Sequence, residues 1–243
     1  MIAELKQLWA EAFEDSQKAI DDFFATGFST NRHHCILQDG IPVSALYWFD
    51  CELNGQKLAY LYAVATLQAY RGQGLARQLL TQTHEILKAQ GYAGALLVPG
   101  ETDLFSFYEK LGYRAVCSVR EFVCEQAEQP AALQEVSAEE YARLRKTLLP
   151  AQGVTQEGAM LDYLQTYCKF YTGDGFLLSA ACGDSHLLTQ EFLGDAALAG
   201  QIVTAFGATD GHFRMPGAGR DFAMLLPFTD DCPKPTYFGL ALD

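Results

Sequence analysis

The residues best suited to chemistry in this sequence are two glycines at the start of a predicted helix. They stand in the segment Arg71-Gly72-Gln73-Gly74-Leu75-Ala76, between a predicted strand over 58–66 and a helix that runs to about Gln90. Glycine lets the backbone approach a ligand closely, and the first amides of a helix have no partner within the helix. A strand, a glycine-rich turn and a helix N-terminus form an anion-binding cradle. The expected chemistry is phosphate binding, with Arg71 and Arg77 adding positive charge at the rim.

The spacing of these glycines excludes two common phosphate-binding signatures. The segment is not the G-x-x-x-x-G-K-[ST] of a P-loop, and no G-x-G-x-x-G follows the first predicted strand. What remains is R-x-x-G-x-A. By itself, so short a motif is equally well explained by an ordinary loop that caps a core helix.

A second candidate for chemistry is Tyr108, in a predicted helix over 104–111 with Asp103 as its cap. A phenol has a pKa of ~10 and a thiol ~8.5, so a tyrosine is protonated at neutral pH and can donate a proton to a departing thiolate. The alternative is that Tyr108 is a core aromatic residue beside Phe105 and Phe107.

Taken together, three segments resemble the GNAT family of acetyl-CoA-dependent N-acetyltransferases. Val64-Ala65-Thr66 ends a central strand, and 71–76 matches the family's [RQ]-x-x-G-x-[GA] signature. The segment Phe107-Tyr108-Glu109-Lys110-Leu111-Gly112-Tyr113 is similar to the family's FYEKLGF. The resemblance covers about residues 2–125. It implies an α/β (α+β) GNAT fold, a mixed and mostly antiparallel sheet flanked by helices.

The resemblance also implies a role for each segment, with acetyl-CoA as co-substrate. The backbone of 64–66 would bind the pantetheine arm, and backbone amides of 72–77 would bind the pyrophosphate. Tyr108 would be the general acid that protonates the departing sulfur, after an amine has attacked the thioester and a backbone amide has stabilised the oxyanion. The implied cofactor-binding residues are Val64, Ala65, Thr66, Arg71, Gly72, Gln73, Gly74, Leu75, Ala76 and Arg77.

Two departures from the family pattern leave questions open. The predicted central strand contains no acid to act as general base, so Asp50, Glu52 and Asp243 are candidates and the base stays unassigned. Glu101 stands where many family members carry an Asn that touches the cofactor, which puts that contact in doubt. The adjacent His33 and His34 point to opposite faces of an extended segment, so we predict no metal site.

The layout of the chain predicts two domains joined by a linker over 126–132. Residues 1–128 form the GNAT domain, and 131–243 a smaller, degenerate GNAT-like lobe that repeats the order of helices and strands. The second lobe has Glu191-Phe192-Leu193-Gly194-Asp195 at the corresponding turn, whose two acids would repel a pyrophosphate, so no acetyl-CoA is expected there. Within the chain we also expect strands over 113–116, 119–124 and 237–242 and a helix over 156–169.

Composition narrows the class of function. Thirty acidic against 17 basic residues give a formal net charge of −13, which argues against nucleic-acid binding and suits a cationic partner. No apolar run reaches the ~18 residues of a membrane span, the N-terminus lacks a secretory pattern, and the seven cysteines show no metal or disulfide spacing. We expect a cytoplasmic N-acetyltransferase that acts on a primary amine of a small cationic molecule in a ternary complex, with a homodimer left open. The alternative is a non-catalytic acyl-CoA-binding or sensor module.

Overall fold

The computed structural model describes residues 1–183 and 185–242. The chain packs as two compact units. Unit 1 consists of residues 1–97, 101–114 and 225–233, and unit 2 of the remaining described residues. This division by packing places residues 115–128 in unit 2, whereas the domains 1–128 and 131–243 remain a prediction from the sequence.

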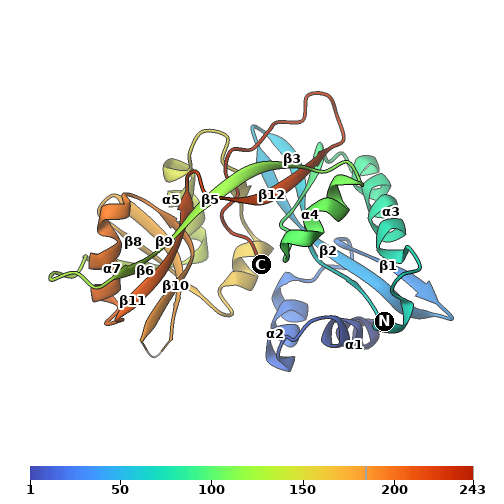
Figure 1. Ribbon diagram of the computed structural model, residues 1–243, viewed down its shortest axis with the longest axis horizontal. Helices are drawn as coiled ribbons and strands as arrows, with labels where there is room; N and C mark the ends of the chain where they lie inside the picture. The colour runs from blue at the N-terminus through green and yellow to red at the C-terminus, as the bar shows by residue number, and fades with distance from the viewer. Residues whose placement is uncertain (184, 243) are drawn as a thin grey trace. The chain divides into compact units, whose positions relative to one another are not determined.

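Unit 1 carries two N-terminal helices, a sheet and two further helices (Figure 1). The elements are α1 (Ile2–Ala12), α2 (Gln17–Asp22), the π-helical turn η1 (Phe23–Gly27), β1 (His33–Gln38), β2 (Ile41–Leu53), β3 (Gln56–Thr66), the 3-10 turn η2 (Gln68–Tyr70), α3 (Leu75–Ala89), β4 (Gly94–Leu97) and α4 (Thr102–Glu109). The strand order is β1-β2-β3-β4, and the end of β12 (Arg220–Pro227) lies beyond β4.

The sheet of unit 1 is antiparallel from β1 to β3 and parallel between β3 and β4. Helices cover both of its faces, as the alternation along β1 shows. The His33 ring contacts Phe28 and Tyr47 on the face that α1 covers, whereas Nε2 of His34 lies 3.1 Å from the Gln82 side chain on α3. Buried leucines anchor both layers, since α1 and α3 each present an apolar stripe to the sheet.

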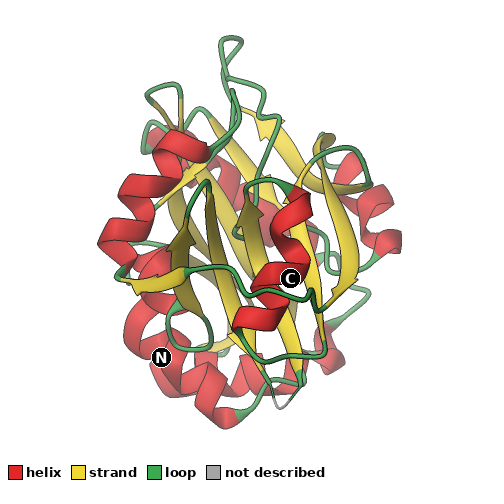
Figure 2. Ribbon diagram, turned by 90° about the vertical axis from the view of Figure 1, so that its left-hand side faces the viewer, coloured by secondary structure: helices red, strands yellow, loops and turns green. Residues whose placement is uncertain are grey.

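Unit 2 is likewise a sheet flanked by helices (Figure 2). Its elements are β5 (Arg114–Glu125), β6 (Leu133–Val136), α5 (Ala138–Leu148), β7 (Thr155–Gln156), α6 (Ala159–Leu164), β8 (Lys169–Gly173), β9 (Phe176–Cys182), β10 (His186–Leu193), the 3-10 turn η3 (Ala196–Leu198), α7 (Ala199–Ala205), β11 (Asp210–Pro216) and most of β12. The strand order is β12-β5-β11-β10-β9-β8-β6, with β10 and β11 parallel.

The predicted fold class, a mixed and mostly antiparallel sheet flanked by helices, is confirmed, while several boundaries are wrong. The two strands expected over 113–124 are one strand, β5, because β11 pairs continuously with residues 119–125. The helix expected over 156–169 is only α6, and the strand β8 begins where that helix was expected to end. Residues 237–242 do not form a strand; Tyr237 makes a single bridge to Gly153.

Among the described residues, no helix has both the length and the apolar character needed to cross a bilayer.

Candidate functional site

The end of β3 departs from regular pairing on both sides. Toward β2, Ala45 pairs with Ala65 but Tyr47 pairs with Tyr62, so β3 carries one extra residue in a β-bulge. Ala63 lies in this bulge with φ +49°, a conformation that is rare for a residue other than glycine. Toward β4, the described pairs end at Tyr60, although β3 continues to Thr66. β4 itself ends at Leu97, so the last six residues of β3 continue beyond the pairs that the two strands form.

Three hydrogen bonds fasten this strand end. Oγ of Ser44 on β2 is fully buried and donates to the Ala65 carbonyl at 2.8 Å. The same oxygen lies 2.9 Å from Oγ1 of Thr66, and Nε of Arg71 donates to the Thr66 carbonyl at 3.1 Å. Arg71 thus links the glycine-rich loop to the strand before it. The sequence predicted only that Arg71 supplies positive charge, and did not predict this hydrogen bond.

The glycine-rich loop has the conformation of an open cradle. Gly72 and Gly74 have φ of +76° and +79°, which only glycine adopts at little cost, and no described atom lies within 4 Å of the place where either Cβ would stand. The first hydrogen bond inside α3 runs from the Gln78 amide to the Gly74 carbonyl at 3.0 Å. The amides of 75–77 therefore precede the helical ladder, and no side chain caps them among the described contacts. Such a site fits a pyrophosphate.

The other residues predicted for the cradle surround this loop. Gln73, Arg71 and Arg77 are exposed, Ala76 is half-buried and Leu75 is buried as the first core residue of α3. Exposed guanidinium groups beside free amides raise the positive potential at the helix N-terminus. The structure thus brings the predicted strand end, loop and helix start together within unit 1.

Tyr108 lies on α4, which follows β4, the strand that runs parallel to β3. Its side chain is 7% exposed, and its ring makes edge contacts with Phe107 and Tyr113. Burial raises the pKa of the Tyr108 hydroxyl to about 12. The N-cap residue of this helix is Glu101 and no side chain caps it, so the expected capping by Asp103 is wrong.

Asp50, one of the candidate bases, is engaged by three neighbouring side chains. Asp50 accepts hydrogen bonds from Tyr92 at 2.5 Å and from Arg32 at 3.4 Å, and Lys57 lies 3.2 Å away. Burial raises the pKa of Asp50, but these donors outweigh burial and the net direction is down. Asp50 also lies four residues along β2 from the bulge, about 13 Å.

Two other acidic residues of interest, Glu52 and Glu101, belong to the described part of the chain. Glu52 pairs in register with Lys57 at the far end of the β2–β3 hairpin. Asp243 lies outside the described residues. Glu101 is exposed at the start of α4. Within the described part of the chain, no group of three or more His, Cys, Asp or Glu side chains is arranged to hold a metal ion.

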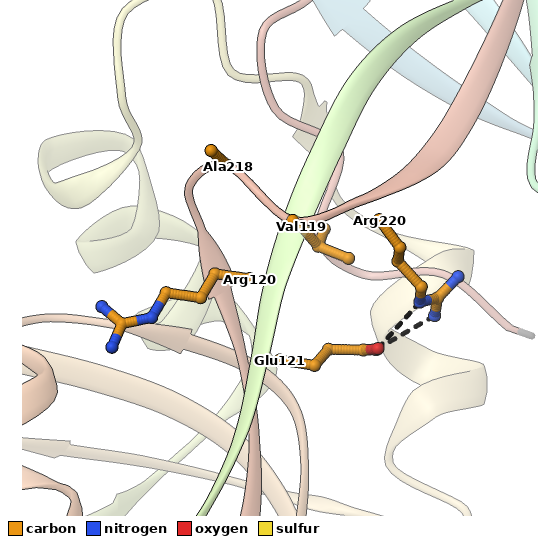
Figure 3. Close-up of a pocket in the computed structure, with 6 residues that line it drawn as sticks. Val119, Arg120, Glu121, Ala218 and Arg220 are labelled. Carbon is orange, nitrogen blue, oxygen red and sulfur yellow. Dashed lines mark hydrogen bonds and ion pairs between the residues drawn. The ribbon is translucent and has the colours of Figure 1, made fainter.

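A separate hollow in unit 2 does not offer a second cofactor site. It measures about 240 Å³ and lies between β5 and the turn that joins β11 to β12 (Figure 3). Two arginines line it. Nε and Nη2 of Arg220 donate to Glu121 at 2.8 and 3.0 Å, and the guanidinium of Arg120 lies over the Phe122 ring, 5.0 Å from its centroid. A guanidinium held by a carboxylate in this way is poorly suited to binding a phosphate.

Comparison with known proteins decides the family. Residues 1–116 match the model of the acetyltransferase (GNAT) domain. Over 116 residues the chain is 31% identical to an uncharacterized N-acetyltransferase, YdgE, of Bacillus subtilis, covering 45% of this chain and 73% of that protein. The chain belongs to the GNAT family. Membership implies acyl-CoA-dependent acetyl transfer and an acyl-CoA co-substrate.

Solved structures extend the similarity of fold beyond the matched residues of this GNAT protein. A GCN5-related N-acetyltransferase of Kribbella flavida has a TM-score of 0.71 at 16% identity, covering 92% of this chain and 68% of that one. A GCN5-related N-acetyltransferase of Anabaena variabilis has a TM-score of 0.70 at 16% identity, covering 92% of this chain and 69% of that one. A putative acetyltransferase of Pyrococcus horikoshii has a TM-score of 0.65 at 14% identity, covering 98% of this chain and 90% of that one. At these identities the similarity concerns the fold alone.

Three residues beside the candidate site were not predicted from the sequence. Ser44 was invisible because its partners lie 21 and 22 residues away. Tyr113 and His84 form a buried hydrogen bond behind Tyr108. The one available signal for this pair was the last letter of the FYEKLGF-like segment, where this chain has a tyrosine in place of phenylalanine.

Proposed function

We propose that the protein is an acetyl-CoA-dependent N-acetyltransferase that transfers the acetyl group to a primary amine of a small cationic molecule, by direct attack in a ternary complex. The observation that carries this proposal is the edge of the unit 1 sheet where the parallel strands β3 and β4 end. The end of β3 that extends past β4, the open start of α3 and the helix that bears Tyr108 all lie at or after those two strand ends. In open α/β sheets, ligands bind at such carboxyl ends.

In this proposal each half of the co-substrate has its own backbone partners. The backbone of Val64, Ala65 and Thr66 pairs with the pantetheine arm in place of β4. The amides around Gly72 and Gly74 and at the start of α3 hold the pyrophosphate, which Arg71 and Arg77 also attract. A backbone amide at the bulge is the proposed donor to the oxyanion that forms when the amine attacks the thioester carbonyl.

Tyr108 is proposed as the general acid. The C–S bond breaks as the tetrahedral intermediate collapses, and the hydroxyl proton passes to the departing sulfur. Because burial holds the pKa of Tyr108 near 12, the hydroxyl keeps its proton until the sulfur gains charge. The attacking amine must lose a proton as well, and we assign no side chain to that step.

The proposed acceptor class rests on charge. Thirty acidic and 17 basic residues leave the protein strongly negative, which raises the local concentration of small cations and their rate of encounter. A polyamine, an aminoglycoside-like compound or a lysine side chain all fit this description.

Calorimetric titration of acetyl-CoA tests the cradle. We expect micromolar binding to the wild-type protein and none to Gly74→Glu, since the side chain is strained at φ +79° and adds negative charge at the pyrophosphate site. Gly91→Glu is the matched control. Gly91 has φ +78° and open space like Gly74, but it lies after the other end of α3.

The outcomes separate the two candidate functions. Equal loss of binding in both glycine variants would mean that backbone strain, not the cradle, explains the effect. Free thiol released only when amines are added to acetyl-CoA and wild-type protein supports the transferase. Saturable binding with no thiol release across an amine panel would favour an acyl-CoA sensor, a reading consistent with the engaged state of Asp50.

A further inference from the structure

A buried hydrogen bond joins the cradle helix to the segment behind Tyr108. Nε2 of His84 on α3 lies 2.8 Å from the hydroxyl oxygen of Tyr113, which follows α4. The exposed fraction is 7% for His84 and 0% for Tyr113. The mechanism proposed above uses neither side chain.

At this buried position, each of the two side chains needs the other as its hydrogen-bond partner. A buried hydroxyl or imidazole without a partner loses its hydrogen bonds to water and gains none in return. A phenylalanine at 113 and a leucine at 84 would fill similar space with no such requirement. Burial lowers the pKa of His84 to about 4, with Lys88 acting in the same direction and Glu85 opposing it. The pair is therefore neutral at physiological pH, and it cannot be explained as an ion pair.

The geometry shows what the pair connects. The Tyr113 ring packs edge-on against the Tyr108 ring, with centroids 5.7 Å apart, and the Tyr113 amide donates to the Tyr108 carbonyl at 3.2 Å. Tyr113 thus fixes both the ring and the backbone of Tyr108. His84 in turn lies on the helix whose first turn forms the cradle, and its ring is flanked by Phe228, 5.7 Å away.

We propose that His84 and Tyr113 are positioning residues, which hold the hydroxyl of Tyr108 in one fixed relation to the acyl-CoA cradle. The inference rests on the proposed function, since it needs Tyr108 to be the acid. Because α3 carries both the cradle and His84, a single rigid helix sets the place of the bound co-substrate and, through Tyr113, the place of the acid. Small displacements of a reacting group have large effects on rate, while binding depends on the unchanged backbone amides.

The test compares kcat and KM in four variants. In His84→Leu and in Tyr113→Phe we expect kcat to fall about tenfold with KM for acetyl-CoA changed less than about twofold. His84→Gln keeps a group that can accept or donate a hydrogen bond and should restore most of kcat. Tyr108→Phe is combined with each variant, because residues that act through Tyr108 should cause no further loss once its hydroxyl is gone. Thermal melts confirm that each variant is folded.

A second measurement does not depend on turnover. With 3-fluorotyrosine at position 108, the wild-type protein should give one sharp fluorine resonance, and His84→Leu should broaden or split it. Unchanged kcat and an unchanged resonance in His84→Leu would overturn the inference, as would equal losses of kcat with and without the Tyr108 hydroxyl. If Tyr108→Phe alone retains full kcat, the acid assignment fails, and the fluorine spectrum still reports whether His84 positions the ring.

Discussion

Tyr108 is the residue on which the proposed chemistry depends, and its surroundings keep its hydroxyl protonated. The side chain is nearly enclosed, and burial raises its pKa to about 12. The protonated form is the one that donates, so a raised pKa keeps the acid ready across the physiological range and beyond. The same burial explains why composition and periodicity alone could not distinguish this tyrosine from an ordinary core aromatic.

Replacing Tyr108 by Phe should lower kcat by about 10²–10⁴-fold while leaving the Kd for acetyl-CoA within about twofold. Since the wild-type acid loses its proton only near pH 12, we expect kcat to rise toward pH 10 as the amine deprotonates, with no falling limb from Tyr108 below about pH 11. A steady-state assay across pH checks both statements. Tyr167→Phe, at a tyrosine that is 41% exposed in unit 2, serves as control. Full activity in Tyr108→Phe would refute the assignment.

At the scale of elements, the junction between β3 and α3 is the part of the fold that matters most for binding. Ser44 holds the strand end from the neighbouring strand, and Arg71 holds it from the loop. The two halves of the cradle are thereby fixed relative to each other before any ligand arrives. Such preorganisation reduces the entropy lost on binding.

Replacing Ser44 by Ala tests this arrangement. The change removes the donor to the buried Ala65 carbonyl, so we expect the protein to lose about 1–3 kcal/mol of unfolding free energy. Acetyl-CoA should bind about three- to tenfold more weakly, because the strand end must be ordered on binding. Ser118→Ala, which removes an exposed hydroxyl bond to the Gly217 carbonyl, is the control. Calorimetry and urea unfolding measure the two effects, and wild-type affinity in Ser44→Ala would contradict this role.

The elements that the sequence predicted well are those with strong local signals. The helix after the glycine-rich loop has a clear apolar stripe and a glycine at each end, and its C-terminal end was predicted to within one residue. Residues 237–242 show the limit of such signals. They are apolar and buried like a strand, but Leu240 bonds through both its amide and its carbonyl to the side chain of Gln156. A backbone segment held by a distant side chain leaves no pattern in the local sequence.

At the scale of the whole molecule, the two units share an order of elements. Unit 2 has α5, α6, β8, β9, β10, α7 and β11 where unit 1 has α1, α2, β1, β2, β3, α3 and β4. In both, the third and fourth strands are parallel and the third carries a register shift. On these features we propose that unit 2 is a GNAT-like lobe, which the layout of the sequence alone predicts.

The turn before α7 differs from the cradle because a side chain caps its 3-10 turn η3. Oδ1 of Asp195 accepts a hydrogen bond from the Ala197 amide at 2.9 Å at the start of η3, whereas among the described contacts no side chain caps the start of α7 or of α3. Repulsion by Glu191, expected from the sequence, is not a valid reason to exclude a pyrophosphate there. Glu191 is fully buried and accepts from Arg145 and Tyr141. We propose that the capped turn, with its amide already used, is what disfavours acetyl-CoA.

The ion pair between Arg145 and Glu191 should be decisive for the stability of unit 2. Removing one partner of a buried pair leaves an uncompensated charge, so Arg145→Met should cost about 3–5 kcal/mol of unfolding free energy. The double variant Arg145→Met/Glu191→Leu should recover most of that loss. Arg143→Met, which breaks an exposed pair on the same helix, should cost less than about 1 kcal/mol. Urea unfolding followed by circular dichroism measures all three, and equal losses at both arginines would contradict the expectation.

The positions of the two tryptophans make the intrinsic tryptophan fluorescence of the protein specific to unit 1. Trp9, on α1, packs in an aromatic cluster with Phe23 and Tyr47. Trp48 donates its indole N–H to Tyr92 on the other side of the same sheet. Both belong to unit 1, and the sequence contains no third tryptophan. Tryptophan emission therefore reports directly on the unit with the acyl-CoA cradle. Unfolding can be followed by this emission and, in parallel, by the circular dichroism of the whole backbone. Comparing the two denaturation curves shows whether the two units unfold together or one after the other.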